Sequence, residues 1–300
     1  MQRKDDAKKS EYREGLIYVL ICQLIWGFLP VYWQSLVPIE SWKIILYRIF
    51  TMFICSYVFA RLKYSREEVL APLKNRRTLL IAFASGLVLT LNWSIYIWAM
   101  TTGHMIQSSI GYYIEPIVIC AFGIVIFKEK LTKYNLAAIM LALLAIGIIL
   151  VHYGQLPGVA LGLALSWAVY SAIKKASELP PVIALVYETM PYAVLALIAI
   201  IFVEIRGIGA LSVGAPRQYA MMWASGLMTF IPIALFGYAA KKTTLLVIGL
   251  AQYISPTITL LLGIFAFGEP IDRVQLLAFA IIWTGLAIFT YGELKSYMHK

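Results

Sequence analysis

This sequence has little charge. Only 13% of its 300 residues are Asp, Glu, Lys or Arg, whereas soluble proteins average about 25%. In contrast, 61% of the residues are hydrophobic, and the mean hydropathy is +0.81. So few charges cannot cover a water-exposed surface, which excludes a soluble enzyme, a disordered protein and a nucleic-acid-binding protein. The composition indicates a membrane protein.

Residues that support cross-linking or catalysis are also scarce. The three cysteines, Cys22, Cys55 and Cys120, lie far apart inside apolar runs, as small buried residues do, and not as a disulfide framework or a metal site. No Gly-rich phosphate loop, HExxH motif or GxSxG motif occurs. The sequence therefore predicts no enzymatic activity, no cofactor and no metal. Without a nucleotide-binding motif, any transport must run downhill or be coupled to an ion gradient.

Ten apolar runs of about 20 residues can be marked between charged or Pro/Gly-rich breaks. Each is long enough to cross a hydrocarbon core of about 30 Å as a helix. The first follows a charged leader, residues 1–14, but it is too long for a signal-peptide core and lacks a small-residue cleavage pattern. The runs are 15–37, 41–62, 78–100, 105–127, 133–152, 157–176, 181–204, 218–240, 243–267 and 273–292.

The basic residues predict the orientation of this array, because Lys and Arg are retained in short cytoplasmic loops. If the N-terminus is cytoplasmic, 20 of the 25 Lys and Arg residues fall in segments on the inner side. Only Arg206, Arg217 and Arg273 fall in outer loops. The prediction is a multi-pass protein of the bacterial cytoplasmic membrane with both termini in the cytoplasm.

An internal repeat appears when the chain is shifted by 140 residues. Residues 77–129 then align with 217–269 without a gap, with about 13 identities in about 53 positions. Among them, Ala-Ser-Gly-Leu at 84–87 recurs at 224–227 and Tyr-Ile at 113–114 recurs at 253–254. The same shift pairs Arg48 with Glu188, and a shift of 141 pairs Trp26 with Trp167.

Each repeat contains five of the ten runs, and an odd number turns the second repeat upside down relative to the first. The predicted fold class is therefore an all-α integral membrane protein with ten transmembrane helices in two inverted five-helix repeats. The predicted divisions are a leader at 1–14, repeats at 15–152 and 157–292, and a tail at 293–300. Inverted repeats are typical of secondary transporters, with the substrate site near the midplane.

Three ionisable residues lie well inside apolar runs, where a charge costs at least about 2.5–3.5 kcal/mol and so needs a partner or a wet cavity. At 1.5 Å of rise per residue, Arg48 is roughly 10 Å from the outer surface and Glu188 roughly 10 Å from the inner one. These two residues are too far apart in depth to bond each other, and we expect each to act in structure or gating. Glu115 lies near the midplane and is a candidate for proton coupling.

Polar residues near two prolines form helical stripes. Pro116 lacks the N–H that would bond the carbonyl of Tyr112, and Pro256 does the same to Gln252, so both runs are expected to kink. These prolines and Pro30 in the first run are candidate kink or gating residues. If the stripes face each other they line a cavity; alternatively, they join helices by hydrogen bonds. The stripes are Ser108, Tyr112 and Glu115 in one run, and Gln252, Ser255 and Thr259 in the other.

Aromatic residues near mid-depth form a second set of candidates. They could stack on a flat or cationic ligand, although aromatic residues in membrane helices more often serve packing. Asn92 shares a helix face with Tyr96. The remaining candidate substrate-binding residues are Trp26, Trp167 and Tyr170.

Several stretches together resemble the drug/metabolite transporter superfamily, in its EamA family, and most closely the RarD-type permeases. The resemblance covers nearly the whole chain. It implies ten helices in two inverted halves, a central cavity and the export or exchange of small metabolites by alternating access. In RarD-type proteins, Asn often stands where Glu115 is, whereas Arg48 and Glu188 match the family pattern. The stretches are 25–33, 47–50, 92–99, 104–116, 188–190 and 251–257.

The sequence therefore predicts a permease for small metabolites or for amphipathic, amino-acid-like solutes. Its expected partners are a small-molecule solute, the lipid bilayer and protons, and not nucleic acid. A polytopic membrane sensor or scaffold without transport activity is the alternative. The absence of a soluble output domain and the polar stripes at mid-depth favour the permease.

Overall fold

The computed structural model describes residues 2–101, 105–154, 158–266, 268 and 272–298 and contains helices but no strand within them. The helices are α1 (Gln2–Gln34), α2 (Ser41–Lys63), α3 (Arg66–Leu70), the 3-10 helix η1 (Ala71–Lys74), α4 (Arg76–Thr101), α5 (Met105–Val125), α6 (Lys133–Tyr153), α7 (Gly158–Ala176), α8 (Pro181–Ile205), α9 (Pro216–Lys242), α10 (Leu245–Ala251), α11 (Ile254–Ala266) and α12 (Arg273–Met298).

The predicted apolar runs overlap the long helices, with two differences. α1 begins at Gln2 and so includes most of the predicted leader 1–14. The run predicted as a single helix over 243–267 is divided into α10 and α11 by a turn at Gln252 and Tyr253. Pro256 contributes to this break, because it cannot supply the N–H that would bond the Gln252 carbonyl. The sequence predicted a kink here and missed the full interruption. It also missed α3 and η1.

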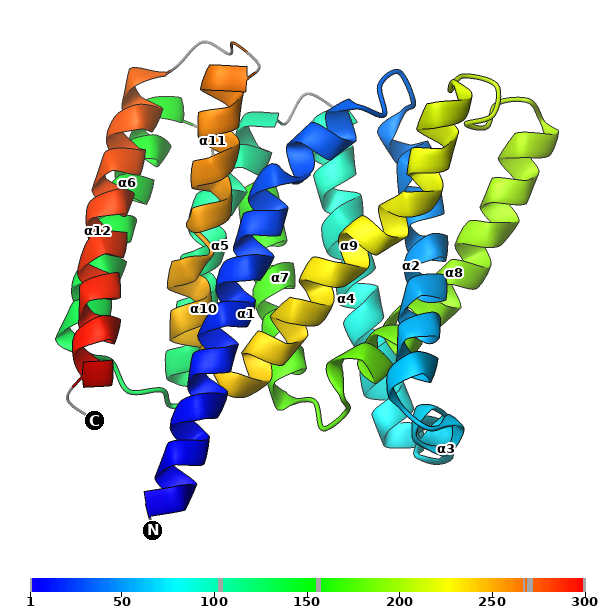
Figure 1. The fold of residues 1–300 in the computed structure, drawn as a ribbon. Helices are drawn as coiled ribbons and strands as arrows, with labels where there is room; N and C mark the ends of the chain where they lie inside the picture. The colour runs from blue at the N-terminus through cyan, green and yellow to red at the C-terminus, as the bar shows by residue number, and fades with distance from the viewer. Residues whose placement is uncertain (1, 102–104, 155–157, 267, 269–271, 299–300) are drawn as a thin grey trace.

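Among the described residues, eight helical stretches are long and apolar enough to cross a membrane, and Ile110–Val125 in α5 is a shorter apolar stretch. The protein is therefore an all-α membrane protein, while the count of ten spans stays a prediction. Both described chain ends and α3 lie at the same end of the bundle (Figure 1); this end is called the lower end below.

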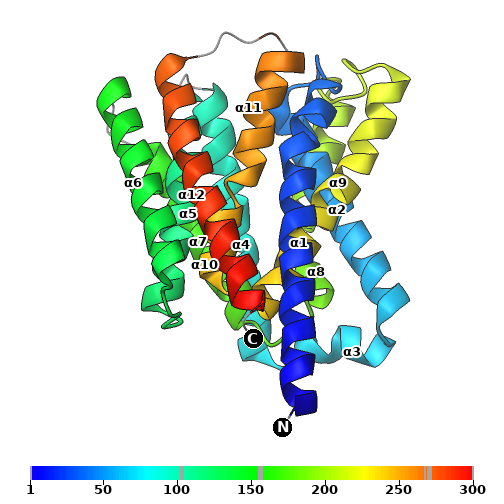
Figure 2. The same cartoon turned by 60° about the vertical axis from the view of Figure 1, so that its left-hand side comes forward.

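Two helix pairs form the edges of the bundle. α6 packs along α12 at one edge and α2 packs along α8 at the other, as Figure 1 shows, and the view in Figure 2 keeps α6 beside α12. Between these pairs, α5 contacts α7 and α10, α1 contacts α9 and α11, and α4 contacts α7 and α8. The central helices thus come from both ends of the sequence.

Two glycines set the closest helix approaches beside the α2–α8 pair. A Cβ atom on Gly86 of α4 would overlap the backbone carbonyl of Glu188 in α8. A Cβ atom on Gly226 of α9 would overlap the backbone of Thr51 in α2. Both positions belong to the repeated Ala-Ser-Gly-Leu stretches, so the recurrence has a packing reason: only glycine allows the backbones to meet.

Candidate functional site

Arg48 in α2 lies against aromatic rings. Its guanidinium carbon is 4.0 Å from the ring centre of Trp93 in α4 and 5.6 Å from that of Trp33 in α1. Its Nε–H group is buried and has no hydrogen-bond partner, and no ion pair of Arg48 occurs with the described residues. The two indole faces can attract the cation, but they leave its Nε–H without an acceptor among the described residues.

Two tyrosines connect Arg48 to Glu115. Tyr96 in α4 and Tyr112 in α5 meet edge to face, with ring centres 6.1 Å apart, and both lie within electrostatic range of Arg48. Tyr112 also lies within electrostatic range of Glu115, which stands one helical turn further along α5. Tyr112 is 44% exposed even though protein surrounds it, so its ring borders an accessible space. Arg48, Trp33, Trp93, Tyr96, Tyr112 and Glu115 are called the upper cluster below.

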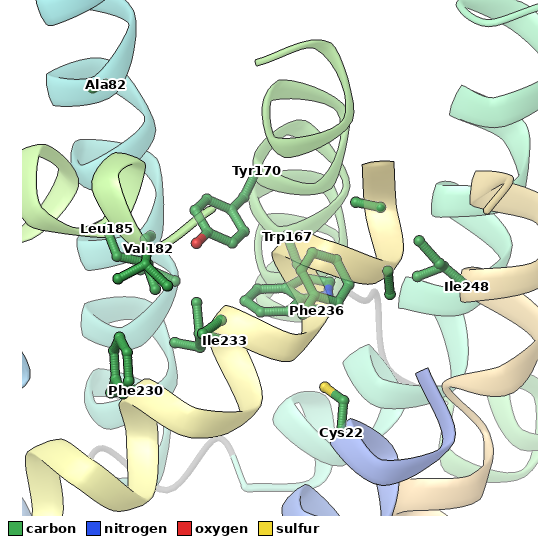
Figure 3. Packing of buried hydrophobic residues seen from close by; sticks show 14 of the residues in the cluster. Cys22, Ala82, Trp167, Tyr170, Val182, Leu185, Phe230, Ile233, Phe236 and Ile248 are labelled. Carbon is green, nitrogen blue, oxygen red and sulfur yellow. The ribbon is translucent and has the colours of Figure 1, made fainter. Parts of the chain in front are cut away.

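The other predicted aromatic residues form a packed layer. Trp167 and Tyr170 of α7 lie against Phe236 of α9, with ring centres 5.3 and 6.3 Å from it, as Figure 3 shows. Trp26 of α1 adds its ring at 5.5 Å from Trp167. Trp167 is 7% exposed and Tyr170 is fully buried, so in this conformation both serve packing and neither borders an open space.

Glu188 forms a buried ion pair below this layer. Its carboxylate oxygens are 3.0 and 3.2 Å from Lys174 Nζ, and the Tyr170 hydroxyl donates to it over 3.1 Å. The Lys174 and Glu188 side chains are each 2% exposed. The sequence analysis counted Lys174 only as one of the basic residues on the inner side and assigned it no partner. A charge placed this far inside needs its counterion more than it needs water.

Burial and hydrogen bonds place some of the predicted polar residues in the structure. Gln252 is only 5% exposed, and its Oε1 is buried without a partner. Asn92 donates to the Leu163 carbonyl over 3.0 Å and so joins α4 to α7. Thr259 donates to the Gly27 carbonyl over 3.4 Å and so joins α11 to α1. For Asn92 and Thr259 the alternative of hydrogen bonds between helices describes what the structure contains.

Other predicted residues are placed by their backbones. Pro30 lies inside α1 and Pro116 inside α5, whereas Pro256 lies in the first turn of α11. Ser255 in the same turn is partly buried. Ser108 belongs to α5, but its side chain lies outside the described set.

A polar network holds the lower end together. Glu129 accepts hydrogen bonds from the backbone N–H groups of Leu245 and Leu246 at the start of α10, over 2.8 and 2.9 Å. It also pairs with Lys175 at 3.3 Å, which itself donates to the Thr243 carbonyl over 2.6 Å. The carboxylate thus satisfies helix N–H groups that have no partner inside the helix.

Sequence reasoning missed several of these partners. The contact of Arg48 with Trp33 and Trp93, and that of Glu188 with Lys174, depend on how helices pack, and no spacing along one helix encodes them. One signal was present: because a charge deep in an apolar run is costly, Arg48 and Glu188 were each expected to need a partner or a wet cavity. For Glu129, its recurrence as Glu269 in the repeat was the only hint.

Comparisons with known proteins identify the family of this chain. The family model of the EamA-like transporter family matches residues 13–151 and again residues 157–291. The uncharacterized transporter YojE of Bacillus subtilis is 35% identical over 95% of this chain and 96% of its own length. Protein RarD of Salmonella typhi is 30% identical over 98% of this chain and all of its own length.

Protein RarD of Escherichia coli is 28% identical over 95% of both chains. A solved crystal structure shares the fold, with a TM-score of 0.70 over 92% of this chain and 97% of its own, at 17% identity. The relative from Bacillus subtilis is named as a transporter, and eight helical stretches of the described chain are long and apolar enough to cross a bilayer. The chain is therefore a membrane transporter of the bacterial inner membrane that belongs to the EamA-like transporter family of the drug/metabolite transporter superfamily and is of the RarD type.

Proposed function

We propose that this protein is a secondary transporter in which two inverted five-helix units, 15–152 and 157–292, carry small amphipathic or amino-acid-like solutes by alternating access. The polar and aromatic upper cluster, contributed by α1, α2, α4 and α5, is the observation on which this proposal rests. A bundle that served only as a scaffold would not need Arg48 and Glu115 well inside the membrane, because each costs insertion free energy.

The helix packing supports inverted repeats. Under the 140-residue shift, α1, α2, α4, α5 and α6 correspond to α7, α8, α9, α10–α11 and α12. The contact of α2 with α9 then has its counterpart in α8 with α4, that of α1 with α9 in α7 with α4, and that of α1 with α11 in α7 with α5. The remaining main contacts, α2 with α8, α5 with α10 and α6 with α12, join corresponding helices. A pseudo-twofold axis in the membrane plane accounts for this pattern.

One pair of corresponding residues supports an exchange between two states. The Tyr253 hydroxyl donates to the Tyr113 carbonyl over 2.8 Å, while the Tyr113 hydroxyl is buried without an acceptor. A symmetric partner state would reverse the bond, with Tyr113 donating to the Tyr253 carbonyl. An unsatisfied buried hydroxyl costs about 1–3 kcal/mol. Each of the two states would leave one such hydroxyl unsatisfied, so the two states can be close in free energy.

The present state fits one that is closed toward the cytoplasm. Every residue of α10 is buried, whereas Gly263 is the buried residue of α11. α10 starts at the lower end, where the termini lie and where the charge distribution predicts the cytoplasm. The Glu129–Lys175 network and the Trp167–Tyr170–Phe236 layer seal this end. The family resemblance implies export or exchange of the solute, and we propose export.

Glu115 is the proposed proton carrier. Glu115 is partly buried near Tyr112, and no ion pair joins its carboxylate to another described residue. A carboxylate deep in a membrane can exchange a proton for a cationic group of the solute.

Flux measurements in proteoliposomes test this function. We expect wild-type protein to move radiolabelled amino acids or amines, with a rate that depends on an imposed pH gradient, and Glu115→Gln to keep any downhill flux but lose the dependence on the gradient. Thr284→Val, at an exposed hydroxyl of α12 that bonds only its own helix, is the matched control. Unchanged gradient dependence in Glu115→Gln would remove the proton coupling. No flux of a broad metabolite panel by folded protein would favour a sensor.

A further inference from the structure

Arg48 is a cation whose charge the described protein leaves unneutralised. Its contacts are the indole rings of Trp33 and Trp93, and its Nε–H lacks an acceptor. Arg48 is partly and not fully buried, so the guanidinium combines a sealed side with an accessible side. A guanidinium offers five donors in a planar fork that fits a carboxylate in bidentate fashion.

The equivalent site in the second repeat is neutralised internally. Arg48 corresponds to Glu188 under the 140-residue shift, and Trp33 corresponds to Lys174 under the 141-residue shift that relates Trp26 to Trp167. In the second repeat these positions form an ion pair at 3.0 Å; in the first, an indole stands where the counterion would be. The indole rings of Trp33 and Trp93 therefore pack against the Arg48 guanidinium, but the described residues provide no anion to neutralise it.

We propose that Arg48 is an anion subsite that binds the carboxylate of the transported solute. The Trp93 and Trp33 rings pack against the guanidinium, and the Tyr96 and Tyr112 hydroxyls are further hydrogen-bond donors. This deepens the proposed transport function and rests on it. One guanidinium with neutral phenols balances a single negative charge, whereas a phosphate group carries about 1.5–2 charges near pH 7. Glu115 beyond Tyr112 can hold the ammonium group of the same solute, so the favoured class is a zwitterion.

Binding in detergent tests the subsite without requiring transport. The probes are L-leucine, L-phenylalanine and benzoate, each compared with its amide, and inorganic phosphate. We expect the carboxylates to change tryptophan fluorescence and raise the melting temperature, while the amides bind at least tenfold more weakly, as expected for lost charge-assisted hydrogen bonds. Trp93→Phe should remove most of the fluorescence change, and Trp223→Phe, at a ring packed on Tyr47, should keep it.

Variants of Arg48 separate recognition from folding. Arg48→Met should weaken carboxylate binding about 10- to 100-fold, and Arg48→Lys should restore part of it, because the charge remains but the fork is lost. Trp33→Glu should abolish binding in a folded protein, because it recreates the internal ion pair of the second repeat. Arg61→Met, at an exposed arginine of the same helix, is the matched control and should bind as wild type does.

The outcomes are distinguishable from those of the transport proposal. Selective carboxylate binding without flux would sustain the subsite and refute transport. Flux that is equal for carboxylates and amides, and unchanged in Arg48→Met, would sustain transport and overturn the subsite. Binding of phosphate alone, or of no probe, would also overturn it. If Arg48→Met does not fold, two measurements still test the subsite. They are the comparison of carboxylate with amide binding in the wild type, and the binding of carboxylates by Trp33→Glu.

Discussion

Removing one member of the Lys174–Glu188 pair should destabilise the protein strongly. Both side chains are 2% exposed, and two Nζ–oxygen contacts of 3.0 and 3.2 Å hold them together. After Lys174→Met, the Glu188 carboxylate would keep only the Tyr170 hydroxyl at 3.1 Å. A single uncompensated buried charge costs about 3–5 kcal/mol, and we expect that loss in the free energy of unfolding for Lys174→Met and for Glu188→Met.

The double variant should recover most of the loss. With both charges replaced by methionine, neither group has to be desolvated, and an apolar pair of similar volume is often neutral or stabilising. The double-mutant cycle should then give a coupling of about 3 kcal/mol or more. The assay is reversible unfolding in mixed micelles of dodecyl maltoside and increasing dodecyl sulfate, followed by far-ultraviolet circular dichroism.

The exposed pair of Lys242 and Glu14 is the matched control, because its side chains are 27% and 48% exposed. Glu14→Gln should cost no more than about 1 kcal/mol. If Lys174→Met also costs less than about 1 kcal/mol, or if the double variant is as unstable as the two single variants combined, the interpretation of a dry, mutually dependent pair is refuted.

Two further predictions concern packing and pH. Gly86→Ala should lower the free energy of unfolding by about 1–3 kcal/mol or more, because the new Cβ would overlap the Glu188 carbonyl. The control Gly147→Ala places its Cβ in open space and should leave stability unchanged or raise it by about 0.5–1 kcal/mol. Equal melting temperatures of the two variants in detergent would contradict this prediction. The Tyr153 hydroxyl and the Val274 N–H hold the pKa of Asp272 below its ordinary value, so its contribution to stability is present above that ordinary value and is lost as the pH falls through the lowered one. Asp272→Asn should therefore flatten the acid limb of the stability curve between about pH 5 and pH 3, and an unchanged limb would show that the contact with Tyr153 contributes nothing.

The sequence predicts the helices well because their cause is local. A run of about 20 apolar residues has few alternatives to a helix in a bilayer, since every backbone polar group must be satisfied within the segment. The ends of α2, α6 and α8 lie within a residue or two of the predicted runs for this reason. The short α3 depends on a different local signal, the capping box of Ser65 and Glu68, which the search for apolar runs did not consider.

The candidate site was only partly predictable, because it depends on which helices become neighbours. The depth of Arg48, Glu115 and Glu188 followed from counting residues, and this singled out charges that need partners. The partner of each charge could not be predicted from that count. Lys174 lies close enough to the end of α7 to suggest a solvated residue, yet the packing of α7 on α8 turns it inward to Glu188.

The prolines show how the same residue leads to different structures in the two repeats. Pro116 and Pro256 are equivalent, and each removes one backbone donor. α5 nevertheless continues through Pro116, whereas the chain breaks between α10 and α11. The difference lies in the contacts: Gly249 of α10 approaches the Pro116 carbonyl so closely that no Cβ fits, and the α10 residues are all buried. The half-helix held at the lower end can thus end before Tyr253, whose hydroxyl then reaches the Tyr113 carbonyl. In the proposed transporter such differences are required, because two inverted halves in identical conformations would make the two ends of the protein alike, so that neither end could open while the other is closed.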